Sequence, residues 1–591
     1  MDGQPANITQ TAPRYAEAEF YRALGLKCGL EMHRQVLTTH KLFCRCPVKP
    51  YSEEYHAEIL RHMRPTLSEL GEYDPTALME FKTKKEIVYR LNRETVCTYE
   101  MDDAPPFGLN REALDRALAI GMMLNLNLVD EIHIARKQYL DGSIPTGFQR
   151  TCIIGINGWM LVDGVRIGIR QLGLEEDACR EVSDHGHRRT YITDRLSIPL
   201  IEIVTEAEMH TPWHAARVGN AIRRLCHLSG QVRTGHGRAR QDVNVSIAGG
   251  DRVEIKGVCS LRQLPALVHF EALRQKALLD IREAALGRGI TAADFDTELD
   301  VTAQARRYPH PAFRLAWGGG VTARAIVLRN CAGLLGLPTA PSRTFGHEIS
   351  DRIRVIACID RKPNLVHSDS SESFTLSALF DEVRRGTGAT ARDTIAIVAG
   401  PAADVATAMS EIRIRMREAL TCVPRETRKS LRSGATCFER MLPGPDRMYP
   451  DTDLPPIVLD DSQFERARGR QPEPLWEKED RYATMGLSKV QIGRLFTEDR
   501  FLTFETVSGS SRLRSTILAY LLLDWVPFMG RRGKDISRLT PERYIKLFAG
   551  DEAASMDQKA AAAHVATVVG YRPKFLSKPD PRAATDGRKR T

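Results

Sequence analysis

The sequence predicts an α+β protein with several domains. Three observations indicate this class. Several segments alternate apolar and polar residues with a period of two, as half-buried strands do. Helical patterns occur over 111–126 and 265–286, and from about residue 473 onwards only short helices are predicted. The chain has 591 residues, which is too many for a single hydrophobic core.

The composition is that of a soluble globular protein, with 42% hydrophobic and 27% charged residues. The net charge of +9 permits a nucleic-acid partner without requiring one. No apolar run approaches the ~18 residues of a membrane-spanning helix. The first 20 residues lack the basic start and apolar core of a signal peptide. The 12 cysteines are scattered along the chain, which favours reduced thiols and a cytoplasmic protein.

The segment 25–47 begins with a predicted strand. Apolar residues at 26, 28 and 30 alternate with residues 27, 29 and 31, so Glu31 and His33 share the other face. An acid and an imidazole so placed can face a metal or a substrate, or can simply be exposed. Cys44 and Cys46 could begin a zinc site, but no second cysteine pair follows and such sites need about four ligands. We therefore predict no stoichiometric zinc.

A basic loop is predicted over 136–150. It follows a helix over 111–126, capped by Asn110, and a strand over 132–135. Cations beside glycine-rich backbone suit an anion such as phosphate or carboxylate, although an ordinary basic loop would look the same. The candidate anion-binding residues of this loop are Arg136, Lys137, Gln138, Ser143, Gln149 and Arg150.

Two acidic features follow. A strand over 165–172 leads into Glu175, Glu176 and Asp177. Three adjacent carboxylates repel one another unless they are solvated, cap a helix or hold a cation, and a helix N-terminus is the commonest of these cases. The strand over 198–204 carries Glu202 among apolar neighbours. Because burial of an unpaired charge is costly, that carboxylate needs a partner.

Residues 235–258 read as two strands around a Gly-Gly turn. Asp242 and Asn244 lie on one face of the first strand, and Glu254 and Lys256 on one face of the second. The four side chains can meet only if the loop has an odd number of residues, either three (249–251) or five (247–251). The alternative is a hairpin whose polar face is merely solvated.

The rest of the chain divides by composition. A helix over 265–286 is followed by a separate α+β module over 290–415, a helix over 411–432 and an extended return over 443–456. Gly318–Gly320 is not followed by Lys-Ser or Lys-Thr, so it is not a phosphate-binding P-loop, and no nicotinamide-type GxGxxG motif occurs. The end of the chain is basic and predicted to be disordered.

Short motifs in a fixed order resemble the GatB/GatE family. They are GLEMH, KLFCRCP, RKQYLDGS, GFQRT, LGLEEDA, DRLSIPLIEIVTE, RQDVNVSI, RVEIKGV, ETR and RMYPDTDLPP. The forms RKQYLDGS and GFQRT are most similar to the GatE branch. The inserted module resembles the insertion domain of bacterial-type aspartyl-tRNA synthetases through RRYPHPAFRL, GGVTARAIVLRNCAGLLG and RTFGHEISD. An Asp that the family tends to have near position 38 is missing, and the tail is shorter, which we expect to affect tRNA binding more than chemistry.

The resemblance implies a domain plan. It comprises a mixed-sheet cradle domain over 20–286, an aspartyl-tRNA-synthetase-like insertion over 287–415, a return to the cradle over 416–460, and an α-helical tail over 461–591 with a basic end.

The resemblance also implies a function, the ATP- and Mg²⁺-dependent amidation of Glu-tRNA(Gln). The glutamyl γ-carboxylate is phosphorylated and then receives ammonia from an asparaginase-like GatD subunit, in a complex of two copies of each. The implied catalytic and metal-binding residues are Glu31, His33, Glu175, Glu176, Asp242 and Glu254. The implied substrate- and phosphate-binding residues are Arg136, Lys137, Ser143, Gln149, Arg150 and Lys256. Two alternatives stay open: a non-catalytic tRNA-binding scaffold, and a GatB-like subunit of a glutamine-dependent enzyme.

Overall fold

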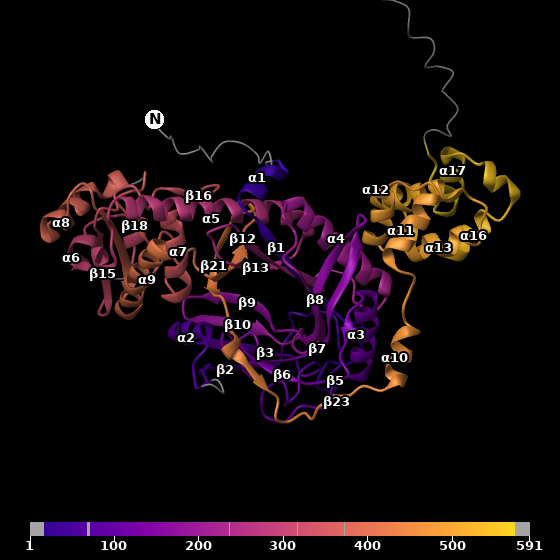
Figure 1. Cartoon of the computed structure of the whole chain (residues 1–591), viewed down its shortest axis with the longest axis horizontal. Helices are drawn as coiled ribbons and strands as arrows, with labels where there is room; N and C mark the ends of the chain where they lie inside the picture. Colours follow the sequence, from indigo (N-terminus) through magenta and orange to yellow (C-terminus); the bar gives the residue numbers. More distant parts are fainter. Residues whose placement is uncertain (1–16, 68–70, 236, 316, 372, 574–591) are drawn as a thin grey trace, which may run out of the picture. The chain divides into compact units, whose positions relative to one another are not determined.

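The computed structural model describes residues 17–67, 71–235, 237–315, 317–371 and 373–573. The chain forms two compact units (Figure 1). The described residues of Met1–Asn220 and Gln231–Arg470 make up the first, and Ala221–Gly230 with the described residues of Gln471–Thr591 make up the second. A large mixed sheet occupies the first unit and short helices the second, which confirms the predicted α+β class. None of the helices in the described ranges is long and apolar enough to cross a membrane.

The large sheet has 11 strands and joins distant parts of the chain. Its order is β21 (Thr436–Met441), β20 (Glu426–Ser430), β13 (Val253–Val258), β12 (Ala239–Ser246), β1 (Lys27–Gln35), β11 (Pro199–Thr205), β8 (Val165–Glu176), β7 (Phe148–Val162), β6 (Ala135–Gln138) and β22 (Met448–Pro450), with β4 (Asn127–Leu128) beside β7. All of these pairs are antiparallel except β13 with β20. A parallel pair needs a long crossover connection, and here that crossover contains the predicted insertion.

The predicted hairpin is β12 and β13. Asn244 pairs with Glu254 and Val245 with Val253, so continuing this register leaves the five residues 247–251 as the loop. The register therefore meets the odd-loop condition and places the polar side chains on one face. A β-bulge interrupts the pairing beyond Val243, and the valines and isoleucine of both strands are buried.

Four smaller sheets complete the strand structure. One contains β2 (Ala57–Arg61), β3 (Glu86–Leu91), β10 (Arg188–Ile192) and β9 (Arg180–His185). Another contains β14 (Thr297–Asp300), β15 (Val321–Leu328), β19 (Thr394–Pro401) and β18 (Val366–His367). The two-stranded sheets pair β16 (Pro338–Ala340) with β17 (Arg343–Thr344), and β23 (Ile457–Val458) with β5 (Glu131–Ile132).

The α-helices fall into two groups. Those up to residue 470 are α1 (Ala18–Ala23), α2 (Pro75–Lys82), α3 (Arg111–Met123), α4 (Pro212–Ser229, shared by both units), α5 (Leu264–Gly287), α6 (Thr302–Ala305), α7 (Phe345–Ile356), α8 (Ser377–Thr387), α9 (Ala402–Thr421) and α10 (Asp461–Arg468). The tail contains α11 (Leu475–Thr484), α12 (Lys489–Thr497), α13 (Phe501–Ser508), α14 (Ser515–Tyr520), α15 (Val526–Arg531), α16 (Pro541–Leu547) and α17 (Gln558–Val568). Asn110 caps α3 as predicted.

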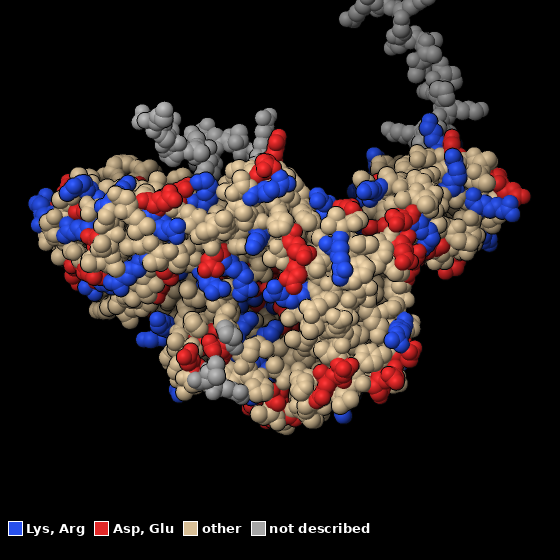
Figure 2. Space-filling model, viewed as in Figure 1, with Lys and Arg blue, Asp and Glu red and all other residues tan. Residues whose placement is uncertain are grey.

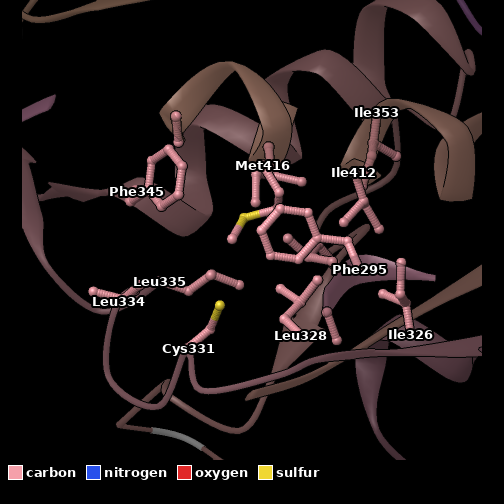
Figure 3. Packing of buried hydrophobic residues seen from close by; sticks show 14 of the residues in the cluster. Phe295, Ile326, Leu328, Cys331, Leu334, Leu335, Phe345, Ile353, Ile412 and Met416 are labelled. Atoms are coloured by element: carbon pink, nitrogen blue, oxygen red, sulfur yellow. The ribbon is translucent and has the colours of Figure 1, made fainter. Parts of the chain in front are cut away.

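The predicted insertion, residues 287–415, shares a core with α5, the first long helix of the crossover between β13 and β20. Phe295, Leu328, Phe345 and Met416 pack together at its centre (Figure 3). Buried residues of α5 and of β13 belong to the same cluster. Burial of this shared apolar surface stabilises the contact of residues 290–423 with α5 and with β13.

Several local predictions are wrong. Residues 411–432 are not one helix, because α9 ends at Thr421 and β20 begins at Glu426. The strand predicted at 132–135 is split between β5 and β6. The basic loop is shorter than predicted, because residues 136–138 belong to β6 and residues 148–150 to β7, while residues 139–147 lie outside strands. No helix begins at Glu175–Asp177; the first two of these acids end β8. The predicted domain boundaries stay predictions, and the basic end from residue 574 lies outside the described residues.

Candidate functional site

A polar pocket of about 460 Å³ lies over one face of the large sheet. Lys and Arg side chains gather where the surface is hollowed over β9, β13 and β21 (Figure 2). Nine predicted site residues line the pocket: Glu31, His33, Lys137, Ser143, Gln149, Glu175, Asp242, Glu254 and Lys256.

Strand register explains why these side chains meet. Residues directly opposite each other on neighbouring strands share a face. In this sheet Asp242 lies opposite Glu31, and Glu202 lies opposite His33. On the far side of β11, Lys137 lies opposite Gln149 on β7. The polar positions of neighbouring strands thus form one continuous surface.

The first candidate ligand set contains His33, Glu175 and Glu202, whose ligand atoms lie within 4.8 Å of one another. Nε2 of His33 is 3.2 Å from Oε1 of Glu202 and 3.7 Å from Oε1 of Glu175. Burial alone would lower the pKa of His33, but the hydrogen bond to Glu202 and the charge of Asp242 raise it above its ordinary value. Burial would raise the pKa of Glu202, but Lys137 and His33 hold it below its ordinary value.

The second candidate set contains Glu31, Asp242 and Glu254, again with ligand atoms within 4.8 Å. Asn244 Nδ2 donates to Glu31 Oε1 at 2.9 Å, and the Gly257 amide donates to Asp242 Oδ1 at 2.9 Å. Burial, with the charges of Glu254, Glu202 and Asp242, raises the pKa of Glu31 to about 7. The second set therefore concentrates more negative charge than its surroundings offset.

Two lysines offset part of the acidic charge. Lys137 Nζ is 2.8 Å from Glu175 Oε2 and 3.8 Å from Glu202 Oε2. Lys256 Nζ is 3.5 Å from Asp242 Oδ2 and 3.6 Å from Glu254 Oε1. Burial opposes the charged form of both lysines, but the carboxylates keep the pKa of each amine above its ordinary value. One cation therefore accompanies each ligand set.

Three predicted site residues lie elsewhere. Arg136 and Arg150 oppose each other on β6 and β7, and each is next to a residue that faces the pocket, so alternation turns both to the other face. Arg150 Nε donates to Asp451 at 2.6 Å. Glu176 is also on that face, where its oxygens accept from Tyr99, Ser197 and the Arg150 amide. Arg136 Nε donates to the Pro450 carbonyl oxygen at 3.3 Å, so all three residues bond to other parts of the protein and none lines the pocket.

Sequence reasoning missed some residues of the pocket. The sequence indicated that the carboxylate of Glu202 needs a partner but did not identify it as a metal ligand. Its position in an otherwise apolar strand was the signal that could have done so. Arg240, Tyr139, Arg440 and Arg447 also line the pocket. Nothing in their local sequence indicated this, because the pairing of distant strands brings them there.

The reason for predicting no zinc is also wrong in part. Cys97 and Glu100 join Cys44 and Cys46, with all four ligand atoms within 4.8 Å. Glu100 Oε1 additionally accepts from Lys41 Nζ at 2.6 Å in a fully buried pair. Ligands for a tetrahedral site are therefore close together, while the absence of zinc stays a prediction.

Carboxylate sets beside lysines are typical of enzymes that act on anionic substrates with divalent cations. Residues 26–465 match the family model of the GatB/GatE catalytic domain, and the chain belongs to the GatB/GatE family. It is 39% identical to the E subunit of glutamyl-tRNA(Gln) amidotransferase from Saccharolobus solfataricus over 88% of this chain and 83% of the relative. The protein of the same name from Methanococcus maripaludis is 35% identical over 91% of this chain and 85% of the relative.

Proposed function

We propose that this chain is the tRNA-dependent subunit of a glutamyl-tRNA(Gln) amidotransferase. It would use ATP to phosphorylate the γ-carboxylate of Glu-tRNA(Gln) and then transfer ammonia to form Gln-tRNA(Gln). The observation that carries this proposal is the pair of ligand sets on one sheet face, each with its own lysine. The names of the relatives support the choice of substrate.

The second ligand set fits Mg²⁺. Its donors are carboxylate oxygens from three strands, and Mg²⁺ prefers oxygen ligands and binds with substrate phosphates. When bound, the ion would neutralise phosphate charge. The first set includes an imidazole, whose Nδ1 has no hydrogen-bond partner among the residues that the structure describes. Glu31, Asp242 and Glu254 would hold one ion, and His33, Glu175 and Glu202 a second.

The protein's own groups would do the remaining work. Lys137 and Lys256 can each turn from carboxylate to a substrate anion, because both line the pocket and keep their charge. They would orient the glutamyl carboxylate and the phosphates for in-line transfer. In the second half-reaction nitrogen forms a bond to the acyl carbon, phosphate leaves with the electron pair of the broken C–O bond, and a proton leaves nitrogen.

The source of nitrogen gives the first test. The sequence shows no Cys-His or Ser-Lys nucleophile pattern for releasing ammonia. We expect the purified chain to form Gln-tRNA with ATP and an ammonium salt, but not with asparagine or glutamine. Amidation supported by asparagine without a partner would contradict this. No product with ammonium would favour the non-catalytic scaffold.

The helical tail gives a second test. Basic side chains bind nucleic acid with an affinity that falls steeply with salt. We expect deletion of residues 473–591 to weaken tRNA binding by about tenfold or more, which corresponds to about 1.4 kcal/mol. Filter binding across a salt series measures this. The deletion should leave cleavage of ATP in the first unit intact, and unchanged tRNA affinity at physiological salt would contradict a role in binding.

The partner and location complete the proposal. An asparaginase-like GatD subunit, in a complex of two copies of each chain, would supply ammonia in the cytoplasm. The inserted module would add shape recognition of tRNA, as its resemblance to an aspartyl-tRNA synthetase domain suggests. Pull-down and mass measurement of the complex would identify the partner and separate this arrangement from a GatB-like one.

A further inference from the structure

Arg447 is a half-buried cation of the polar pocket that has no acidic partner in the described ranges. Most other cations of the pocket form an ion pair with a carboxylate. Examples are Lys85, Lys137, Arg189, Arg240, Lys256 and Arg440. Arg354 and Lys429 also lack an acid, but the former donates to a backbone carbonyl and the latter is exposed. Since partial burial of an unpaired charge is costly, Arg447 is suited to a ligand that brings negative charge.

Strand pairing brings Arg447 to Tyr139. Met448 of β22 lies opposite Lys137 of β6, so the same register places Arg447 beside the end of β6, next to Tyr139. The guanidinium carbon of Arg447 is 5.1 Å from the centre of the Tyr139 ring, and that of Arg440 is 5.3 Å from it. Planar guanidinium groups pack well on aromatic rings. Because two carboxylates hold Arg440, the ring has one fixed neighbour and one, Arg447, that can bind a ligand.

The hydroxyl group of Tyr139 shows which charges surround this place. Burial would raise the pKa of Tyr139, but nearby cations lower it below its ordinary value. In order of effect, these cations are Arg447, Lys256, Lys137 and Arg440. An arrangement that favours a phenolate oxygen also favours a phosphate oxygen. Burial would lower the pKa of Arg447, but Tyr139 and Glu254 hold it above its ordinary value, so Arg447 keeps its charge close to the second ligand set.

We propose that Arg447 binds the phosphoryl group that ATP transfers to the glutamyl carboxylate, and that Tyr139 is the positioning residue that orients its guanidinium. This inference rests on the proposed function. Arginine binds two phosphate oxygens at once, and the charge of the transferred group is spread over its equatorial oxygens. Arg447 would thus supply the guanidinium that the sequence led us to expect from Arg136 and Arg150.

The step that Arg447 assists is balanced without a proton from the protein. A glutamyl carboxylate oxygen forms a bond to the γ-phosphorus. The bond from that phosphorus to the bridging oxygen breaks, and ADP leaves with the electron pair. Arg447 forms no covalent bond and only offsets the charge of the moving group.

Nucleotide binding tests Arg447 without turnover. Titration calorimetry on the full chain with Mg²⁺ compares ADP with the β,γ-imido analogue of ATP, which keeps a γ-phosphate but does not transfer it. We expect Arg447→Met to weaken binding of the analogue about tenfold and to leave ADP affinity within about twofold. Arg447→Lys, which keeps the charge but not the paired donors, should give a smaller loss for the analogue. The unchanged ADP affinity shows that the site is folded.

Arg170→Met is the matched control for this titration. The Arg170 side chain is 63% exposed, and it does not line the pocket. Both nucleotides should bind this variant as they bind the wild type. Equal losses for the two nucleotides in Arg447→Met overturn the assignment to the γ-phosphate, as does no loss for either. A wild-type chain that binds neither nucleotide contradicts the proposed function itself.

Two variants test Tyr139 as a positioning residue. Single-turnover formation of ADP with Glu-tRNA(Gln), without ammonia, measures the transfer step. We expect Tyr139→Leu, which removes the ring, to slow this step about tenfold, and Tyr139→Phe, which keeps it, to stay within about threefold of the wild type. ADP affinity should be unchanged in both, which excludes a general loss of structure.

The outcomes separate this inference from the proposed function. A Tyr139→Phe variant as slow as Tyr139→Leu assigns the effect to the hydroxyl group and overturns the positioning role, as does a wild-type rate in Tyr139→Leu. Arg447→Met should slow the same step about a hundredfold. An active wild type with variants of equal rate contradicts only this inference, whereas a wild type that forms no ADP with Glu-tRNA(Gln) contradicts the proposed function.

Discussion

We expect Asp242→Asn and Glu254→Gln each to lower ATP-dependent formation of Gln-tRNA by about a hundredfold or more. Both carboxylates belong to the all-oxygen ligand set and lie near Lys256. An amide cannot carry the charge that holds a divalent cation against phosphate. The substitutions keep side-chain shape and leave Lys256 with one acidic neighbour, so folding should be preserved.

Single-turnover amidation with ammonium measures the effect, and tRNA affinity is measured beside it. Glu283→Gln on α5 is a suitable control, because this acid is exposed and outside the pocket. tRNA affinity should change little, since the basic tail provides most of the phosphate contacts in our proposal. Near-normal turnover in both variants would falsify the ligand assignment. Equal losses of binding and turnover would indicate misfolding instead.

We expect Glu348→Gln to lower the free energy of unfolding by about 3–5 kcal/mol. Glu348 of α7 is 3% exposed and binds two buried arginines. Arg274 of α5 donates to it at 2.7 Å through Nη2, and Arg428 of β20 donates at 3.0 Å through both terminal nitrogens. Removing this acid leaves two guanidinium groups buried with less compensating charge.

The pH dependence of this contribution has a definite sign. Burial would raise the pKa of Glu348, but Arg274 and Arg428 hold it well below its ordinary value of 4.5. A carboxyl group whose pKa is lower in the folded state stabilises the fold at pH values above its unfolded-state pKa. This stabilisation is lost progressively as the pH falls from the unfolded-state pKa through the folded-state pKa. Urea unfolding at pH 7 and at pH 4 should therefore show a smaller difference between variant and wild type at the lower pH. Equal stabilities at pH 7 would contradict the predicted role.

This ion network also links the insertion to the large sheet. It joins α5, α7 and β20, which carry Arg274, Glu348 and Arg428 respectively. β20 pairs with β13, so the network is next to the strand that carries Glu254 and Lys256. Its loss is therefore expected to loosen the second ligand set as well as the insertion.

Much of the candidate site could be predicted from short-range patterns. Alternation placed Glu31 on the same face as His33, and Asp242 on the same face as Asn244. The hairpin loop has an odd number of residues, which is the condition for the polar faces of its two strands to meet. The same rule was not applied at 136–150, where glycines and basic residues indicated a loop although both ends of the segment are strands. Lys137 was consequently grouped with Arg136 and Arg150, which the sheet turns away from it.

The sequence by itself determined which side chains share a face along each strand, since a β-strand repeats every two residues and most acids of the site are followed by an apolar residue that needs burial. Only the tertiary structure decided which strands are neighbours. It placed β1 between β11 and β12, paired His33 with Glu202, and brought Cys97 to Cys44 and Cys46. The physical reason is that strand pairing is chosen by packing and hydrogen bonding between segments far apart in the chain. No local pattern records that choice.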